Sequence, residues 1–413
     1  MTNVTRSDLQ QLDHEDPLAS FREEFLLPEG IIYLNGNSLG AMPREAVQRS
    51  RRVVEVEWAK GLIGSMNTAG WFELPLSLGR KIAALVGAAP NEVVITDSTG
   101  INLYKVLAAA LQIQPSRRVI VMEGSNFPTD NYMVQGLLAQ LGDGYTIRFA
   151  EADEIMAAID ADVAAVCMTH VHYKTSNILD METITERAHA VAAVAIWDLC
   201  HSIGVMPIDL NACKVDFAVA CTYKYLNGGP GSPAMIFAAE KHHGKYRQPL
   251  TGWFGHAAPF DFEQDYRPAD GIRQMLSGTQ PIVSMSLAEI GIDIALRADM
   301  QAVRAKSMRM TDLFIELVES RCSAFDVSVA SPRDASQRGS QVSFYFADAY
   351  PLVRAMHERG VSCDYRAPGM LRFGFAPLYN SYADVWNAVD ILYHILQAGS
   401  WQDAQYQQRN LVT

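Results

Sequence analysis

Short apolar runs alternate with segments of helical periodicity through the middle of the chain. Runs rich in β-branched residues predict strands, and turns carrying Gly, Pro, Asp or Ser separate them from the helical segments. Several runs are apolar throughout, which is typical of strands buried on both faces. The predicted strands are Val93–Thr96, Val119–Met122, Ala164–Thr169, Val194–Asp198, Phe217–Cys221 and Ala234–Phe237. The pattern predicts an α/β fold with a mostly parallel sheet covered by helices on both sides.

The helical segments between these strands are long enough to serve as crossover connections. They are predicted at Leu103–Leu111, Asn131–Leu141 and Ile184–Ala193. From about Met285 one long helical stretch runs to about Glu319, and shorter strands and helices follow it. These later elements are predicted at Gln341–Tyr345, Met370–Phe375 and Ala383–Leu396. We expect a large domain over residues 51–290, a smaller α/β domain over 291–413, and an N-terminal segment, 1–50, that packs with the smaller domain.

The composition of the 413 residues argues against two classes of protein. Hydrophobic residues make up 49% and charged residues 19%, which is ordinary for a folded soluble chain and unlike a disordered one. The formal net charge is −12 and no dense basic run is present, so nucleic acid is not an expected partner. The one local basic cluster, residues 241–247, is interpreted as a solvated loop.

The cysteines and the N-terminus bear on location. Six cysteines are scattered without CxxC spacing, several of them in apolar runs, which suits a reducing compartment. The N-terminus lacks the apolar segment of a secretory signal, and no stretch reaches the ~18 apolar residues of a membrane span. We expect a cytoplasmic protein that does not enter a membrane. No metal site is predicted, because Cys200 with His201 and His170 with His172 lack partners at ligand spacing.

Two charged residues end strands of the predicted sheet, where open α/β sheets bind their ligands. Asp198 ends one strand run, with His201 three residues on, and Tyr223 and Lys224 follow another. Asp198 and Lys224 are one strand-connection-strand unit apart, so both can face one crevice. A desolvated lysine loses its charge more easily and becomes the neutral amine that attacks carbonyls. An aspartate beside a pyridinium nitrogen keeps that ring an electron sink, so the pair indicates pyridoxal phosphate.

The structural alternative is a buried ion pair between Asp198 and Lys224, which for an arbitrary pair is favoured by roughly ten to one. The neighbouring sequence changes that balance. The segment 97–100, DSTG, is a strand-turn-helix junction that can hold a phosphate, although Ser and Thr are also common helix N-caps. Phe127 can cover a flat ring at a strand end, although such a Phe is more often core. The glycine-rich 228–232 lacks a nucleotide-binding context and is interpreted as a tight turn.

With these residues assembled, the chain resembles kynureninase, and especially its bacterial members, almost from end to end. The resemblance is carried by YLNGNSLG (33–40), SNFPTD (125–130), WDLCHSIG (197–204), CTYKYLNGGPGS (221–232), GWFGH (252–256), GTQPI (278–282) and RFGFAPLYN (372–380). Together these motifs are highly specific, although each alone is weak. The resemblance implies an aspartate-aminotransferase-like fold of type I, with a mostly parallel seven-stranded sheet and a smaller C-terminal domain. It also implies a pyridoxal-phosphate hydrolase of tryptophan catabolism.

The resemblance implies a role for each site residue. Lys224 holds the cofactor as an imine, Asp198 faces the pyridine nitrogen, Phe127 stacks on the ring and His201 lies close to the cofactor. Further positions match the family's phosphate region (Thr99, Gly100 and Tyr223), its cofactor site (Asp130 and Thr169) and residues that reach in from a second subunit (Trp253 and Thr279). A homodimer with shared active sites follows by analogy. Tyr223 is the candidate proton donor, and its structural alternative is simple packing beside Lys224.

The substrate side rests on the same resemblance. Arg372 matches the arginine that binds the substrate α-carboxylate, a task suited to a planar bidentate donor, and its alternative is a surface ion pair. Asn37 and Ser38 match a substrate-side loop. Two positions depart from the family: Asn35 replaces the usual Asp, and Met66 stands where an aromatic residue is expected in the aryl pocket. A flexible thioether makes that wall softer, which leaves the preferred ring substituents open.

The expected reaction is hydrolysis of L-kynurenine to anthranilate and L-alanine. The nearest alternative is 3-hydroxykynurenine or another ring-substituted analogue, motivated by Met66. A more distant one is another fold-type I activity, such as an aminotransferase or a cysteine desulfurase. The desulfurase needs a mobile catalytic cysteine in an exposed loop, whereas most cysteines here lie in apolar runs. From a different class comes a non-catalytic protein that binds the cofactor for structure or regulation.

Overall fold

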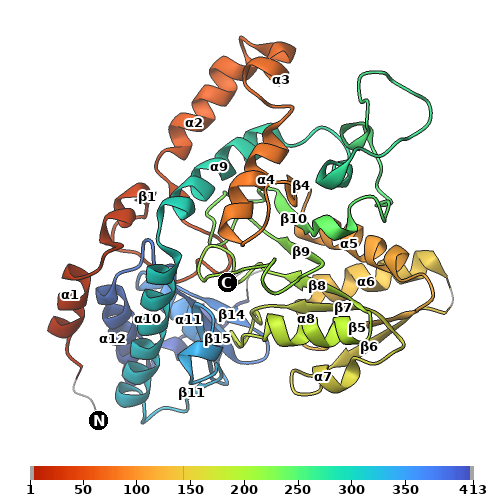
Figure 1. Cartoon of the computed structure of the whole chain (residues 1–413). Coiled ribbons are helices and arrows are strands. Elements are labelled where there is room, and N and C mark those ends of the chain that lie inside the picture. Colours follow the sequence, from red (N-terminus) through yellow and green to blue (C-terminus); the bar gives the residue numbers. More distant parts are fainter. Residues whose placement is uncertain (1–3, 143, 410–413) are drawn as a thin grey trace.

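The computed structural model describes residues 4–142 and 144–409, and a seven-stranded sheet forms the centre of its larger part (Figure 1). The strand order is β4-β10-β9-β8-β7-β5-β6. Strand β10 is antiparallel to both of its neighbours, and the other pairs are parallel. The strands are β4 (Val93–Thr96), β5 (Val119–Glu123), β6 (Thr146–Ala150), β7 (Val163–Thr169), β8 (Val194–Asp198), β9 (Phe217–Ala220) and β10 (Ala234–Ala238). The predicted mostly parallel α/β sheet is confirmed.

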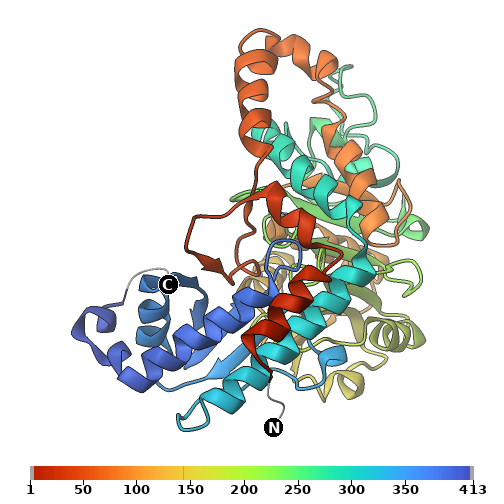
Figure 2. The same ribbon diagram turned by 90° about the vertical axis from the view of Figure 1, so that its left-hand side faces the viewer.

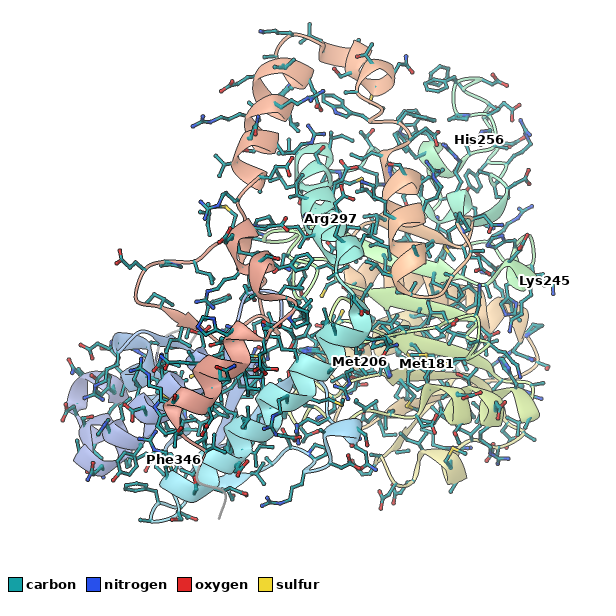
Figure 3. All side chains as sticks on the ribbon, turned by 60° about the vertical axis from the view of Figure 1, so that its left-hand side comes forward. Met181, Met206, Lys245, His256, Arg297 and Phe346 are labelled. Atoms are coloured by element: carbon teal, nitrogen blue, oxygen red, sulfur yellow. The ribbon has the colours of Figure 1, made fainter. Side chains whose placement is uncertain are left out.

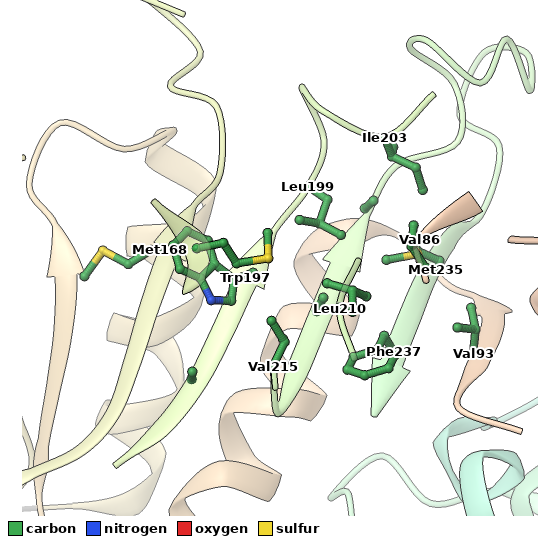
Figure 4. Packing of buried hydrophobic residues seen from close by; sticks show 14 of the residues in the cluster. Val86, Val93, Met168, Trp197, Leu199, Ile203, Leu210, Val215, Met235 and Phe237 are labelled. Atoms are coloured by element: carbon green, nitrogen blue, oxygen red, sulfur yellow. The ribbon is translucent and has the colours of Figure 1, made fainter. Parts of the chain in front are cut away.

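Helices cover both faces of this sheet because alternate strand residues point to opposite sides. Val93 and Ile95 pack with α4 (Leu74–Leu85), α8 (Met181–Ala190) and α9 (Ile282–Arg297) in one core cluster. Val94 belongs to a second cluster on the other face, with α5 (Thr99–Ile113) and α6 (Pro128–Leu141). Figure 4 shows the first cluster, in which Trp197 and Met168 lie on neighbouring strands.

A four-stranded sheet forms the smaller C-terminal part. Its antiparallel order is β11-β12-β15-β14, and helices α10, α11 and α12 pack on it through a third core cluster. The elements are α10 (Met300–Arg321), β11 (Ser328–Val329), β12 (Gln341–Tyr345), α11 (Ala349–Glu358), β14 (Asp364–Arg366), β15 (Met370–Gly374) and α12 (Tyr382–Ala398). In Figure 3, Phe346 lies in this part, while Arg297 lies at the end of α9, where the chain leaves the large sheet.

The N-terminal segment packs beside the C-terminal part. Helix α1 (Arg6–His14) lies against α12, and the Asp13 carboxylate accepts the backbone amides of Tyr382 and Ala383 at the first turn of α12 (Figure 2). Strand β2 (Ile32–Tyr33) pairs in parallel with β13 (Val361–Ser362). These contacts support the proposed grouping of residues 1–50 with 291–413; residues 1–3 and 410–413 lie outside the described part of the chain.

The remaining elements connect these parts. They are η1 (Ala19–Glu24), β1 (Phe25–Leu26), β3 (Met42–Pro43), α2 (Ala46–Arg52), η2 (Val53–Trp58), η3 (Leu62–Gly64), α3 (Ser65–Thr68), α7 (Ile155–Ala158), η4 (Glu240–His242), η5 (Trp253–Gly255), η6 (Gly271–Met275), η7 (Ala335–Gln337), η8 (Ser400–Gln402) and α13 (Ala404–Gln407). The long helix predicted from Met285 to Glu319 is two helices, because Asp299 caps α10 by accepting the amide of Gln301. Over the described residues, every helix is too short or too polar to cross a membrane.

Candidate active site

A cavity of about 390 Å³ opens at the carboxyl ends of the central strands, where the two parts of the chain meet. Strands β7 and β8 end in this cavity at Thr169 and Asp198, and Lys224 follows the end of β9. This is the position at which open α/β sheets bind ligands, and the volume suits a small organic molecule. The predicted site residues that line it are Asn37, Ser38, Thr99, Gly100, Phe127, Asp130, Thr169, Asp198, His201, Tyr223, Lys224 and Arg372.

Lys224 is half-buried and lines the cavity. Its Nζ is 3.0 Å from Nε2 of His201, and the second ring nitrogen of His201 is buried with no hydrogen-bond partner among the described residues. Burial, followed by the positive charge of Lys224, lowers the pKa of His201 well below its usual value. His201 is therefore a neutral ring that accepts a hydrogen bond from the lysine.

The sequence argument predicted a lowered pKa for Lys224, whereas its surroundings in the structure raise that pKa. Burial does lower its pKa, but the acidic groups of Cys221, Cys200, Tyr223 and Asp198 around it together raise it above the ordinary value. The sequence argument considered only the effect of desolvation on this pKa, because the sequence alone does not show which acidic groups surround Lys224. The amine of Lys224 therefore has to lose a proton before it can act as a nucleophile.

Two aspartates lie side by side deep in the cavity. Asp198 accepts the backbone amide of Cys200 at 2.6 Å, and Asp130 accepts the side-chain amide of Asn126 at 3.0 Å. Burial and the charge of Asp198 raise the pKa of Asp130 well above its usual range. The raised pKa favours the protonated form of Asp130.

The start of helix α5 forms the end of the cavity that can hold a phosphate. Ser98 is the N-cap residue and makes no side-chain capping bond, so first-turn amides near Thr99 and Gly100 remain open to an anion. At Gly100 a Cβ atom would lie 2.9 Å from Cε of Met133 and 3.2 Å from Cγ2 of Thr129. Glycine therefore keeps this end of the cavity clear.

Phe127 and Thr169 line the cavity next to the aspartates. Phe127 is 44% exposed and its ring meets the Tyr173 ring edge to face at 5.2 Å, so one face is available to a flat ligand. The Thr169 hydroxyl donates to Asn126 Oδ1 at 2.5 Å, and that same oxygen accepts the amide of Phe127. Asn126 therefore ties the positions of Phe127, Thr169 and Asp130 together.

The small-domain wall of the cavity carries the predicted arginine. Arg372 is buried, and its Nε and one terminal nitrogen donate to both carboxylate oxygens of Asp364 at 2.7 and 2.6 Å. Ser38 donates to the same carboxylate at 2.6 Å, and Asn37 donates to Gln341 at 3.1 Å. Arg372 is thus in a buried bidentate ion pair, unlike the surface pair that was the alternative.

Three predicted residues of the described chain lie away from this cavity. Trp253 and Thr279 are exposed on the surface of the large domain. Met66 packs on the edge of the large-domain core beside Phe72, whose ring lies 6.4 Å from the Trp253 ring. One chain alone therefore does not bring Met66 to the cavity, and its place in the aryl pocket stays a prediction.

The structure adds cavity residues that the sequence analysis did not assign to the site one by one. Most of them lie within motifs that it quoted, whereas Met133, Tyr173 and Arg366 lie outside those motifs. They are Ser98, Thr129, Met133, Tyr173, Cys200, Gly231, Ser232 and Arg366 in the lining, with Asn126 directly behind it. Across residues 4–142 and 144–409, no group of three or more His, Cys, Asp or Glu side chains has the arrangement of a metal site.

The residues fit pyridoxal phosphate on three observations. The cavity joins a half-buried lysine and a pair of neighbouring aspartates to an uncapped helix N-terminus. A glycine clears that helix end, and a half-exposed phenylalanine lies beside the aspartates. An amine for the aldehyde, an acid for the ring nitrogen and amides for the phosphate are the groups that this cofactor requires.

Comparisons of structure place the fold in a known class. A cysteine desulfurase from Thermococcus onnurineus NA1 superposes with a TM-score of 0.77 at 20% identity, covering 92% of this chain and 98% of that one. The cysteine desulfurase CsdA from Escherichia coli gives a TM-score of 0.77 at 17% identity, with the same coverage. At these identities the likeness shows the fold alone, which is the fold-type I architecture that the sequence predicted.

Comparisons of sequence reach further. A kynureninase from Pseudomonas fluorescens is 50% identical over 415 residues, covering 99% of this chain and 100% of the relative. A kynureninase from Burkholderia mallei (strain SAVP1) is 49% identical over 414 residues, with the same coverage. The family model of the kynureninase C-terminal domain matches residues 303–392. With this identity over nearly its whole length, the chain belongs to the kynureninase family.

Proposed function

We propose that this chain hydrolyses L-kynurenine to anthranilate and L-alanine with pyridoxal phosphate as its cofactor. The observation that carries the proposal is the placement of Lys224, Asp198 and the open N-terminus of α5 in one cavity, with Arg372 on the opposite domain. As a member of the kynureninase family, the chain is a pyridoxal-phosphate hydrolase. The preference among kynurenine and its ring-substituted analogues is part of the proposal.

Each part of the cofactor has residues that would hold it. Thr99, Gly100 and Tyr223 would hold the phosphate, Phe127 and Thr169 the ring, and Asp198 its nitrogen. Asp130 and His201 would support Asp198 and Lys224 from behind. When bound, the cofactor supplies an aldehyde that condenses with amines and a ring that takes up the electron pair left at the substrate Cα.

The side chains would then control the proton transfers of the reaction. The Lys224 amine, once free of its proton, is the base placed to take the substrate α-proton, and His201 accepts a hydrogen bond from it. Burial, followed by the charge of Cys221, raises the pKa of Tyr223, so its hydroxyl stays protonated and can donate. Tyr223 is therefore our candidate for proton delivery during cleavage of the Cβ–Cγ bond.

We also propose that the active enzyme is a homodimer with shared sites. Trp253 and Thr279 are exposed and do not line their own cavity, and Phe260, whose ring contacts Trp253, is 62% exposed, with Phe262 two residues on at 82%. In such a dimer Met66 also lies on the partner-facing surface. Its effect on substituted kynurenines would then be a property of the dimer, measurable as ratios of kcat/KM.

We propose a cytoplasmic location because the cysteines are free thiols. All six are unpaired in the structure, and five of them are buried, which suits a reducing compartment.

The test of the function is direct. Purified enzyme loaded with cofactor is incubated with L-kynurenine, and anthranilate is followed by its fluorescence. Borohydride reduction followed by peptide mapping should label Lys224, and Lys224→Ala should abolish both the label and turnover. Bound cofactor without anthranilate would defeat the reaction, and a label on another lysine would defeat the assignment of the site.

A further inference from the structure

We propose that Arg366 is a second guanidinium that binds the substrate α-carboxylate together with Arg372. The inference rests on the proposed function and adds a residue to its substrate site. Arg366 and Arg372 line the same cavity from neighbouring antiparallel strands, β14 and β15. Asp364 and Arg366 are two residues apart on β14, and Asp364 pairs with Arg372 on β15. All three side chains therefore lie on the same face of the sheet.

Arg372 has little hydrogen-bonding capacity left. Its side chain is only 2% exposed, and it donates to both oxygens of Asp364, to Ser38 Oγ at 3.0 Å and to the carbonyl of Tyr173. A guanidinium has about five N–H groups, and these contacts use four of them. If Arg372 alone bound a substrate carboxylate through two hydrogen bonds, one of these buried bonds would have to break, which is unfavourable.

Arg366 is the more available cation. Its side chain is 33% exposed, and it contacts Asp364 at 3.1 Å and donates to the carbonyl of Tyr365 at 2.8 Å. Asp364 is therefore shared by two arginines, which leaves one positive charge without a matching negative charge. A single carboxylate arriving from the cavity balances that charge, and a mobile planar donor is suited to receive it.

The position of Arg366 fits the reacting groups. Burial and the charge of Lys224 are the largest causes of the lowered pKa of His201. The charges of Arg372 and Arg366 lower it further, so both arginines lie within electrostatic range of this ring. His201 in turn contacts the Lys224 amine at 3.0 Å. A carboxylate held between the two arginines therefore keeps the attached Cα near Lys224. The cofactor phosphate is a separate anion, because it would lie at the N-terminus of α5.

Arg366→Gln and Arg366→Lys, loaded with cofactor, test the inference beside the wild type. Arg333→Gln serves as the control, since Arg333 forms an exposed pair with Glu319 on the small domain. The measured quantities are KM and kcat for L-kynurenine and the inhibition constant of its decarboxylated analogue, which keeps the amine and aryl ketone. We expect Arg366→Gln to raise KM about tenfold or more and to change the inhibition constant by less than about threefold. Arg366→Lys should give a KM between those of the wild type and Arg366→Gln, because lysine keeps the charge but not the planar arrangement of N–H donors.

Equal weakening of both ligands, or a fall in kcat with KM unchanged, would overturn the inference, since either pattern indicates that Arg366 only positions Asp364. If Arg366→Gln does not fold or load cofactor, the ratio of the two constants in Arg366→Lys decides, and an unchanged ratio rejects the proposal. A wild type that makes no anthranilate would instead reject the proposed function.

Discussion

At the scale of single residues, the two neighbouring aspartates differ in their surroundings. Burial and the charge of Asp198 raise the pKa of Asp130, which favours its protonated form, whereas Asp198 accepts the amide of Cys200. One negative charge is sufficient to hold a proton on a pyridine nitrogen, and a second buried carboxylate would be destabilising. The raised pKa of Asp130 therefore favours a role as a hydrogen-bonding group beside Asp198.

This difference predicts unequal effects of the same substitution. Asp198→Asn removes the carboxylate and should lower kcat/KM for L-kynurenine by about a hundredfold or more. Asp130→Asn replaces a protonated acid with a neutral amide of similar shape and should lower kcat/KM by about tenfold at most. Steady-state kinetics on both variants, with cofactor content measured from absorbance, make the comparison. Equal losses would show that both aspartates act as anions.

Glu123 is a buried acid outside the cavity, and it makes stability depend on pH. Burial, followed by the charge of Glu151, raises its pKa to about 7 from an ordinary 4.5. The folded protein therefore keeps this proton up to about pH 7, whereas the unfolded chain releases it near pH 4.5. The stabilising contribution is present below pH 4.5 and is lost as the pH rises towards 7 and beyond.

Glu123→Gln should remove this loss. At pH 8 the variant is expected to be more stable than the wild type by up to about 3 kcal/mol, and at pH 4.5 the difference should be small. Urea unfolding at both pH values measures the free energy of unfolding. Glu151→Gln is the control, because it removes only the smaller, exposed charge. A lower stability of Glu123→Gln at pH 8 would contradict the assignment.

At the scale of elements, helix α9 fixes the loop that carries Lys224. A Cβ at Gly291 would lie 2.0 Å from the Leu226 carbonyl oxygen and 2.9 Å from the Asn227 carbonyl carbon. No side chain fits in that space, so the helix and the loop contact each other through their backbones. The position of the lysine therefore depends on helix packing far along the chain.

Gly291→Ala should separate α9 from this loop. We expect a loss of about 1 to 3 kcal/mol in the free energy of unfolding, with weaker binding of the cofactor. Gly136→Ala on α6 is the matched control, since its Cβ meets nothing within 4 Å and helix propensity predicts a gain of about 0.5 to 1 kcal/mol. Denaturant unfolding and cofactor titration test both variants. Unchanged cofactor affinity in Gly291→Ala would show that the packing of α9 does not affect the cofactor site.

The elements also show what the sequence could predict. β4 and β8 have the predicted bounds, because a strand buried on both faces is an unbroken apolar run. β6 was missed, since this edge strand carries Thr146 and Arg148 and is only partly buried. β14 was missed because Asp364–Arg366 is short and charged, and with it the sequence analysis missed Arg366.

For the site, residues at strand ends could be placed from the sequence because parallel strands end at one edge of the sheet. The family resemblance added Asn37, Ser38 and Arg372, which local patterns could not relate to that edge. The hydrogen bonds that occupy Arg372 and the acidic surroundings of Lys224 depend on tertiary contacts. Such contacts follow from packing between distant segments, so no local pattern encodes them.

At the scale of the whole molecule, the proposed homodimer would divide each site between two chains. Lys224 lines the cavity, whereas Trp253 and Thr279 lie exposed elsewhere on the large domain. In a twofold dimer each surface is used twice, so a residue exposed in one chain can complete the cavity of its partner. Every active site would then contain residues of both subunits.

This arrangement predicts complementation between two inactive variants. Lys224→Ala removes the amine of its own cavity, and we expect Trp253→Ala to impair the cavity of the partner. In a heterodimer of the two, one cavity carries both defects and the other carries neither. Subunits exchanged at equal concentration should therefore recover up to about a quarter of wild-type anthranilate production. Each variant mixed with itself is the control. Exchange demonstrated by differently tagged subunits, with no recovery of activity, would show that Trp253 serves its own chain or neither, and would remove the shared site.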